Sequence, residues 1–118
     1  MPPTIKDLKP YVPAKDFELS QRFYAALGFT LTPAFGGTYD AELNGHRFRL
    51  QDAYVKDWAN NFMMLIVIDA VEAWHEHVLE MQSSGNYPGM RVQDPVPIGG
   101  SQVLHVHDPS GVLLVFVQ

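Results

Sequence analysis

The sequence predicts an α+β fold in which two successive βαβββ modules form one domain of 118 residues. Two segments with apolar residues at helical spacing, 17–27 and 70–84, are each followed by a glycine that ends the helix. Each helix is preceded by a strand-length segment and followed by three short extended segments that turn sequences separate. The order strand, helix, three strands therefore occurs twice.

The first module covers about residues 5–54. Residues 8–14 form an extended segment interrupted by prolines, and Asp16 follows at the N-cap position of a helix that ends at Gly28. Asn44 and Gly45 form a strong signal for a two-residue hairpin turn. The three predicted strands of this module are FTLTPAF, GTYDAEL and HRFRLQDAY.

The second module covers about residues 62–118. Its first segment, FMMLIVI, is apolar throughout, which predicts a strand buried on both faces. Asp69 and Glu72 have the spacing of a capping box at the start of DAVEAWHEHVLEM, and Gly85 ends that helix. A turn from Asp108 to Gly111 precedes the last strand. The three predicted strands after the helix are GMRVQDPVPI, SQVLHVH and GVLLVFVQ.

Composition excludes several classes of function. The chain has eight Lys and Arg residues against thirteen Asp and Glu, a net charge of −5, so it offers no basic field for nucleic acid. It has no cysteine, which excludes disulfides, thiolate metal sites and cysteine nucleophiles. No apolar run approaches the roughly 20 residues of a membrane span. We therefore expect a cytoplasmic protein that binds neither nucleic acid nor membrane.

Two stretches resemble a known superfamily. PYVPAKDFELSQRFYAALGF is similar to the opening of bleomycin-resistance-type proteins, and VLHVHDPSGVLLVF resembles the closing hairpin of the wider glyoxalase/bleomycin-resistance/dioxygenase (vicinal oxygen chelate) superfamily. The resemblance implies mixed sheets that form a cleft, and a symmetric homodimer whose ligand clefts lie between the subunits. It says little about chemistry, because one fold supports many functions.

Enzymes of this superfamily hold a metal with His and Glu side chains on the first and last strands of each module. The positions that resemble these ligands are Lys9, Arg49, Met63 and Val115 in this sequence. Divalent cations need carboxylate, imidazole or thiolate donors, and none of the four residues supplies one. The resemblance therefore predicts no metal, no cofactor and no catalytic residue at the family site.

A ligand-binding cleft remains the expected site. Lys9 and Arg49 favour an anionic or hydrogen-bond-accepting ligand, and aromatic residues near the cleft mouth suit stacking on a planar one. His105 is expected to face the cleft and shares a strand face with His107, whereas His75 and His77 are expected to be solvated and His46 to begin a surface strand. The predicted ligand-binding residues are Lys9, Phe35, Tyr39, Arg49, Tyr54, Trp58, Met63 and His105.

Three functions are compatible with these observations. The leading hypothesis is a metal-free homodimer that binds an amphipathic or anionic small molecule, as antibiotic-sequestering bleomycin-resistance proteins do. The alternative is a metal-dependent glyoxalase-like lyase or isomerase, or a dioxygenase, in which His105 or His46 joins a carboxylate at a shifted position. A structural dimer with a degenerate cleft is the third, and it would show neither a metal nor a closed polar pocket.

Overall fold

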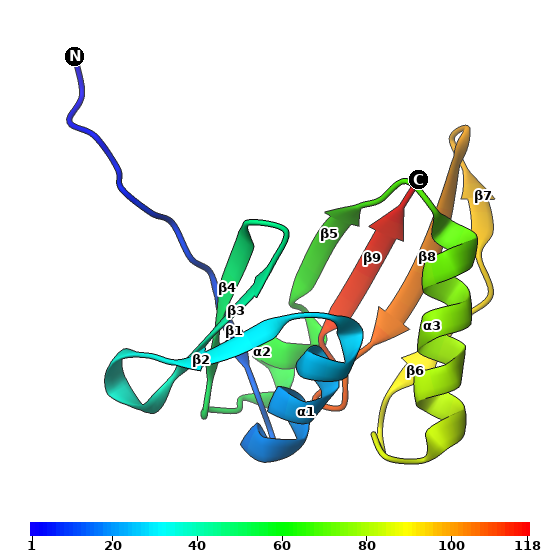
Figure 1. The fold of residues 1–118 in the computed structure, drawn as a ribbon, viewed down its shortest axis with the longest axis horizontal. Coiled ribbons are helices and arrows are strands. Elements are labelled where there is room, and N and C mark those ends of the chain that lie inside the picture. The colour runs from blue at the N-terminus through cyan, green and yellow to red at the C-terminus, as the bar shows by residue number, and fades with distance from the viewer.

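The duplicated order of elements is present in the computed structural model, which describes residues 1–118 (Figure 1). The elements of the first half are β1 (Tyr11–Pro13), α1 (Phe17–Leu27), β2 (Thr30–Pro33), the short 3₁₀ helix η1 (Phe35–Gly37), β3 (Tyr39–Leu43) and β4 (His46–Gln51). A short helix, α2 (Lys56–Asn60), joins the halves. The elements of the second half are β5 (Met63–Val67), α3 (Val71–Ser84), β6 (Arg91–Val92), β7 (Val96–Ile98), β8 (Ser101–His107) and β9 (Leu113–Val117).

The two halves form two mixed sheets with equivalent topology. Sheet A has the strand order β1-β4-β3-β2, and sheet B has the order β5-β9-β8-β6, with β7 also paired to β8. In each sheet the first strand of the module pairs in parallel with the last one, and the other pairs are antiparallel. The predicted α+β fold with two βαβββ modules is confirmed.

Local sequence signals explain the ends of α1 and the β3–β4 hairpin. The Asp16 side chain accepts a hydrogen bond from the Leu19 amide at 3.1 Å, as an N-cap residue does. Gly28 ends the helix with φ of 128°, a conformation that favours glycine. Asn44 and Gly45 both have positive φ, 53° and 83°, which matches the twist required between two antiparallel strands.

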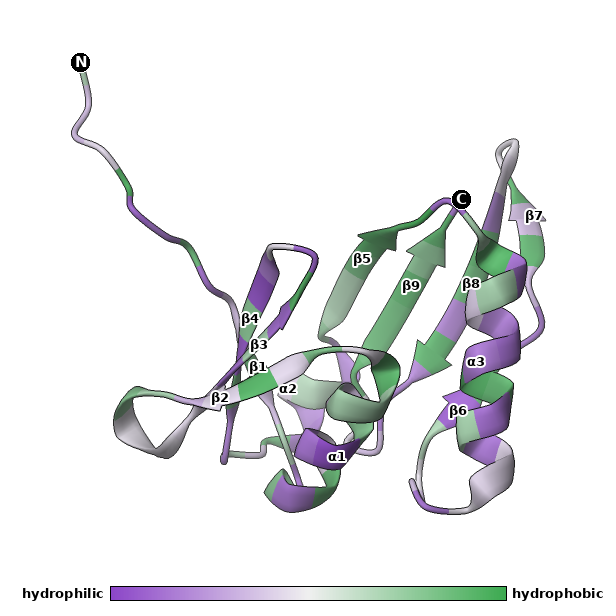
Figure 2. Ribbon diagram, viewed as in Figure 1, coloured by the Kyte–Doolittle hydropathy of each residue, from purple (hydrophilic) through white to green (hydrophobic).

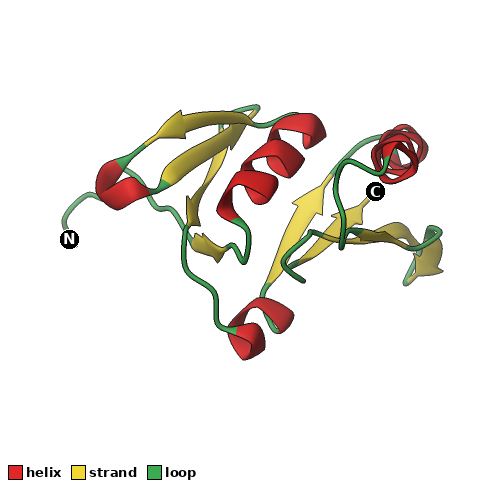
Figure 3. Ribbon diagram, turned by 90° about the horizontal axis from the view of Figure 1, so that it is seen from below, coloured by secondary structure: helices red, strands yellow, loops and turns green.

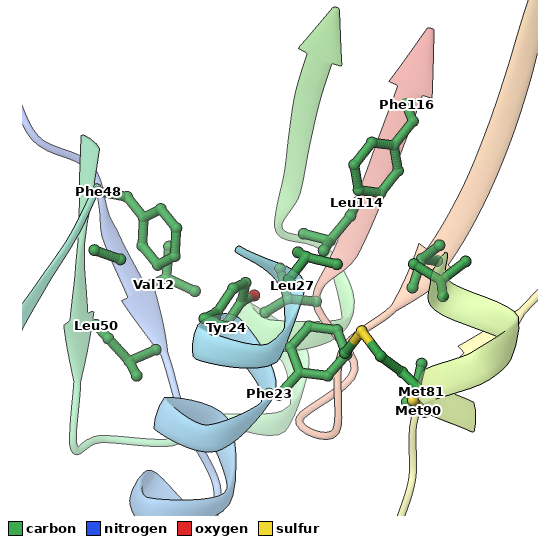
Figure 4. Close-up of a cluster of buried hydrophobic side chains, with 14 of the residues drawn as sticks. Val12, Phe23, Tyr24, Leu27, Phe48, Leu50, Met81, Met90, Leu114 and Phe116 are labelled. Atoms are coloured by element: carbon green, nitrogen blue, oxygen red, sulfur yellow. The ribbon is translucent and has the colours of Figure 1, made fainter. Parts of the chain in front are cut away.

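One hydrophobic core serves both modules. Helix α1 lies between the two sheets, and α3 packs on sheet B (Figure 3). Figure 4 shows three side chains of α1 surrounded by side chains of both sheets. These side chains are Phe23, Tyr24 and Leu27 of α1, Val12, Phe48 and Leu50 of sheet A, and Leu114 and Phe116 of sheet B. The other face of each sheet, here called its outer face, points away from this core.

A buried polar pair joins the modules within the core. Tyr24 of α1 donates a hydrogen bond from its hydroxyl to Oδ2 of Asp108, at 2.6 Å, and both residues are fully buried. Oδ1 of Asp108 accepts from the backbone amides of Ser110 and Val112 at 2.8 and 3.0 Å. Sequence analysis placed Asp108 in the turn before the last strand, and in the structure it also links the β8–β9 turn to α1.

The start of the second helix differs from the prediction. The capping box of Asp69 and Glu72 is wrong, because the N-cap residue is Ala70, which has no side chain able to cap. The Val71 amide instead donates to Oε1 of Gln118 at 2.8 Å. An acceptor from the end of the chain thus replaces the local cap that the sequence pattern indicated.

Two strand predictions also need correction. GMRVQDPVPI forms two short strands, β6 and β7, rather than one, and Pro95 and Pro97 explain this because proline cannot donate to a strand ladder. FMMLIVI forms β5, but β5 is an edge strand buried on one face only, since every second side chain is exposed. The segment 55–61, for which no element was predicted, contains α2.

The N-terminal segment before β1 extends away from the rest of the chain (Figure 1), and its apolar side chains Ile5 and Leu8 are exposed. None of the three helices is long and apolar enough to cross a membrane.

Candidate functional site

The outer face of sheet A carries a charged cluster centred on Asp40. Lys9 donates from Nζ to Oδ2 of Asp40 at 2.8 Å, and Arg49 donates from Nε to Oδ1 at 2.8 Å. Arg49 also donates from a terminal nitrogen to the Tyr11 hydroxyl at 3.4 Å. Register explains the grouping, because Arg49 of β4 is the cross-strand partner of both Asp40 and Tyr11.

The hydrogen bonds to Asp40 reduce the positive charge that Lys9 and Arg49 present to a ligand. Hydrogen bonds from Arg49 and Lys9 lower the pKa of Asp40 to about 2, so the carboxylate is charged at neutral pH. The bond to Asp40 likewise raises the pKa of Arg49 above its ordinary value. Asp40 therefore already neutralises one of the two cations, and the pair presents polar, hydrogen-bonding groups rather than two free charges.

The outer face of sheet B is apolar over most of its area. Three side chains of β5 are exposed there: Met63 by 62%, Leu65 by 67% and Val67 by 77%. Leu65 pairs with Val115 of β9, so these two side chains lie side by side on this face. Figure 2 shows that β5 and β9 are hydrophobic along most of their length. The remaining apolar members are Leu113 and Val117 of β9, Val103 of β8, and Val96 and Ile98 of β7.

Histidine and arginine side chains occupy one end of this face. His105 is the cross-strand partner of Val115, which places it beside the apolar patch. His107 lies two residues further along β8 on the same face and is the partner of Arg91 in β6. Burial, followed by the charges of Arg91 and His105, lowers the pKa of His107. Sequence analysis placed His107 on the same strand face as His105 without including it among the ligand-binding residues, and it missed Arg91.

A groove of about 600 Å³ runs between the β3–β4 hairpin and β5. Mostly apolar side chains line it, including Phe48 and Trp74, and the exposed side chains of β5 form part of its wall. The groove and the outer face of sheet B therefore meet at β5. Of the eight predicted ligand-binding residues, only Met63 lines this groove.

The four predicted aromatic residues come from separate segments. Phe35 is in η1 and is 85% exposed, whereas Tyr39 points to the inner side of sheet A, where its ring contacts Phe17 edge-on at 5.7 Å. Tyr54 packs against the core, and Trp58 of α2 lies edge-on to Phe62 at 6.4 Å. The structure does not bring these rings together into one wall.

The strand register shows which residues lie opposite one another at the positions that resemble the family's metal ligands. Arg49 pairs with Tyr11 rather than Lys9, and Val115 pairs with Leu65 rather than Met63. In both modules the first-strand position assigned from sequence lies two residues before the cross-strand partner. None of these side chains is a usual ligand for a divalent ion, and no three His, Asp or Glu side chains are grouped to hold one.

His77 of α3 is exposed, as predicted, and its Nε2 also lies 2.8 Å from the Ala26 carbonyl oxygen of α1. His75 was also expected to be solvated, but it is half-buried, and its Nε2 has no hydrogen-bond partner, with the nearest Asp94 oxygen 3.5 Å away. The two histidines do not form a site. His46 begins β4 and is exposed, as expected.

Comparison of the structure with solved structures identifies the fold. No protein-family model and no curated protein matches the sequence. A hypothetical protein from S. aureus aligns with a TM-score of 0.78 at 19% identity, covering 98% of each chain. A bleomycin-binding protein in complex with bleomycin aligns with a TM-score of 0.76 at 22% identity, covering 97% of this chain and 98% of the other.

A bleomycin resistance determinant encoded on the transposon Tn5 aligns over the same shares of the two chains, with a TM-score of 0.77 at 22% identity. The chain thus has the fold of the bleomycin-resistance proteins, as the sequence resemblance implied. At these identities the similarity is one of fold.

Proposed function

We propose that this protein is a metal-free small-molecule-binding protein that sequesters an amphipathic ligand on the outer face of sheet B. The observation that carries the proposal is the row of exposed apolar side chains on β5, Met63, Leu65 and Val67, on a sheet face that no helix covers. A contiguous exposed apolar patch is characteristic of binding surfaces. The patch adjoins a groove of about 600 Å³, within the range of small-molecule sites.

The proposal includes a homodimer. Because both outer faces point away from the shared core, a single chain does not close a cleft between them. A second copy related by a twofold axis would place the polar outer face of sheet A, with Lys9 and Arg49, opposite the apolar face of sheet B, with Met63 and His105. A cleft with one polar and one apolar wall suits an amphipathic ligand.

The side chains at the family's ligand positions support a function without a metal. Arg49 and Lys9 are cations, and Leu65, Met63 and Val115 have no donor suited to a hard divalent ion. No hydroxyl or carboxylate in the described surfaces is paired with a histidine as a nucleophile and its base would be. Binding without chemistry is therefore the function we propose.

The fold neighbours support one candidate ligand, which titration tests. Two of the neighbours are bleomycin-binding proteins in complex with bleomycin or its copper(II) complex, and we propose that this chain sequesters a comparable amphipathic antibiotic. Calorimetric titration with bleomycin tests this identity directly. Heat of binding that saturates at one ligand per subunit would support it, and absence of binding would exclude bleomycin while leaving the surface to be tested.

The surface itself is tested with a neutral fluorescent probe, N-phenyl-1-naphthylamine. We expect the wild-type protein to enhance its fluorescence saturably, and Leu65→Gln to weaken binding. Val55→Gln is the matched control, because Val55 is an apolar residue exposed to a similar degree, 59%, at the start of α2. Equal binding by both variants and the wild type would refute the assignment of the ligand to the β5 face.

A further inference from the structure

The polar end of the sheet B face contains a cluster of basic side chains with no acidic partner. Arg91 and His107 are cross-strand partners, and His105 follows on the same face. Arg91 forms no ion pair and no side-chain hydrogen bond, unlike Arg47 and Arg49 of sheet A. None of the cross-strand positions of this face in β5, β9, β8 and β6 is an Asp or Glu.

One atom of the cluster is buried without a hydrogen-bond partner. Nδ1 of His107 is inaccessible and makes no hydrogen bond within the protein. A buried polar atom in this state costs free energy unless another group satisfies it. Neutral imidazole presents either a donor or an acceptor at this nitrogen. A rotation of the His107 ring that exposes the nitrogen would let an oxygen of a bound ligand supply the missing partner.

The basic side chains on the outer face of sheet A, unlike those of this cluster, already have an acidic partner. There, Asp40 already accepts from both Lys9 and Arg49, so the cations expected to attract an anion are occupied. The chain has a net charge of −5, so most of its surface repels an anion. A basic cluster that has no carboxylate partner and borders an apolar patch is therefore the surface that binds an anionic amphiphile most favourably.

We propose that Arg91, His107 and His105 hold an oxyanion, such as a carboxylate, sulfonate or phosphate, attached to the apolar body of the ligand. This inference rests on the proposed function and specifies its ligand as an anionic amphiphile. The planar guanidinium of Arg91 binds two oxygens of such a group, and His107 and His105 lie beside it on the same face. The apolar body lies along Leu65, Val115 and Met63.

Two probes with the same ring systems separate the anion from the apolar body. 8-Anilinonaphthalene-1-sulfonate carries a sulfonate, and N-phenyl-1-naphthylamine is its neutral counterpart. We expect Arg91→Gln to weaken binding of the sulfonate by about ten-fold, the effect of losing one charge-assisted hydrogen bond, and to leave the neutral probe unaffected. Arg22→Gln is the matched control, because Arg22 is an exposed arginine of α1 that lies on neither outer face, and its side chain donates to the Asn86 carbonyl oxygen. This substitution should change neither affinity.

A spectroscopic readout accompanies the affinities. The imidazole ¹⁵N resonances of His107 should shift when the sulfonate is added and should not shift with the neutral probe. Equal sulfonate affinity of wild type and Arg91→Gln, while both probes bind, would overturn the oxyanion site and leave the proposed binding surface intact. Failure of both probes to bind the wild-type protein would overturn the oxyanion site and the proposed function together.

Discussion

Removing the Tyr24 hydroxyl isolates the buried polar link between the two modules. Phenylalanine at this position keeps the ring, which contacts Phe23 and Phe48 edge-on at 5.0 and 4.9 Å, and deletes only the donor to Asp108. Oδ2 of a fully buried carboxylate then loses its partner, which costs about 1.5–3 kcal/mol for a hydrogen bond to a charged group. We expect Tyr24→Phe to lower the free energy of unfolding by about that amount at pH 7.

The pH dependence of this loss tests its cause. Burial raises the pKa of Asp108 above its ordinary value of 3.8, and the Tyr24 hydrogen bond opposes that rise. Between 3.8 and the raised pKa the folded state binds more protons than the unfolded state, so this carboxyl makes the protein less stable as pH increases through that window. Tyr24→Phe raises the pKa further, so its penalty should be largest at neutral pH and smaller once Asp108 is protonated.

Urea unfolding of wild type and Tyr24→Phe, followed by circular dichroism at a series of pH values, measures both effects. Comparing the two proteins at each pH cancels the titration of every other group. A penalty below about 0.5 kcal/mol at pH 7, or one that grows as the pH falls toward 4, would refute the reasoning, because either result means that Tyr24 does not stabilise the charged carboxylate.

Three further predictions concern other parts of the structure. The Asp40 carboxyl should titrate at about pH 2 by ¹³C NMR. The stability contributed by its hydrogen bonds to Lys9 and Arg49 should be present above about pH 4 and lost as pH falls toward 2. An ordinary pKa near 3.8 would contradict these hydrogen bonds. Gly111→Ala should destabilise the β8–β9 turn by about 1 kcal/mol or more in thermal unfolding, because φ is 98° and the new Cβ would lie 2.7 Å from Oδ1 of Asn60, whereas Gly36→Ala, with open space around it, should cost less. Elemental analysis of the purified protein should find no stoichiometric transition metal, and calorimetric titration with Mn, Fe(II), Ni and Zn should show no tight binding; stoichiometric tight metal would support the enzymatic alternative.

Local signals predicted much of the fold. The glycines that end α1 and α3 and the Asn44–Gly45 turn act through the backbone of their own segments, so a single sequence reveals them. The Asp69 cap failed because Gln118, 47 residues away in the chain, satisfies the Val71 amide. The five-residue helix α2 was missed because so short a segment shows no clear periodicity.

The candidate site was less accessible to sequence analysis. FMMLIVI is apolar on both faces, and only the tertiary arrangement shows that β5 is an edge strand with one face uncovered. The pairing of Asp40 with Arg49 had a usable signal, since each residue lies four positions from the two-residue turn, which sets the register of the hairpin. Arg91 had no such signal, because the sequence does not reveal that its short strand β6 pairs with β8, where its neighbour His107 lies.

Amide NMR during titration with 8-anilinonaphthalene-1-sulfonate tests the central claim most directly, because it shows where a small molecule binds. The account predicts that the shifts concentrate at Leu65, Val115 and His105, which are neighbours across three strands of the sheet B face. Shifts confined to residues that line only the inner part of the groove, such as Phe48 and Trp74, or no saturable shifts at all, would contradict it.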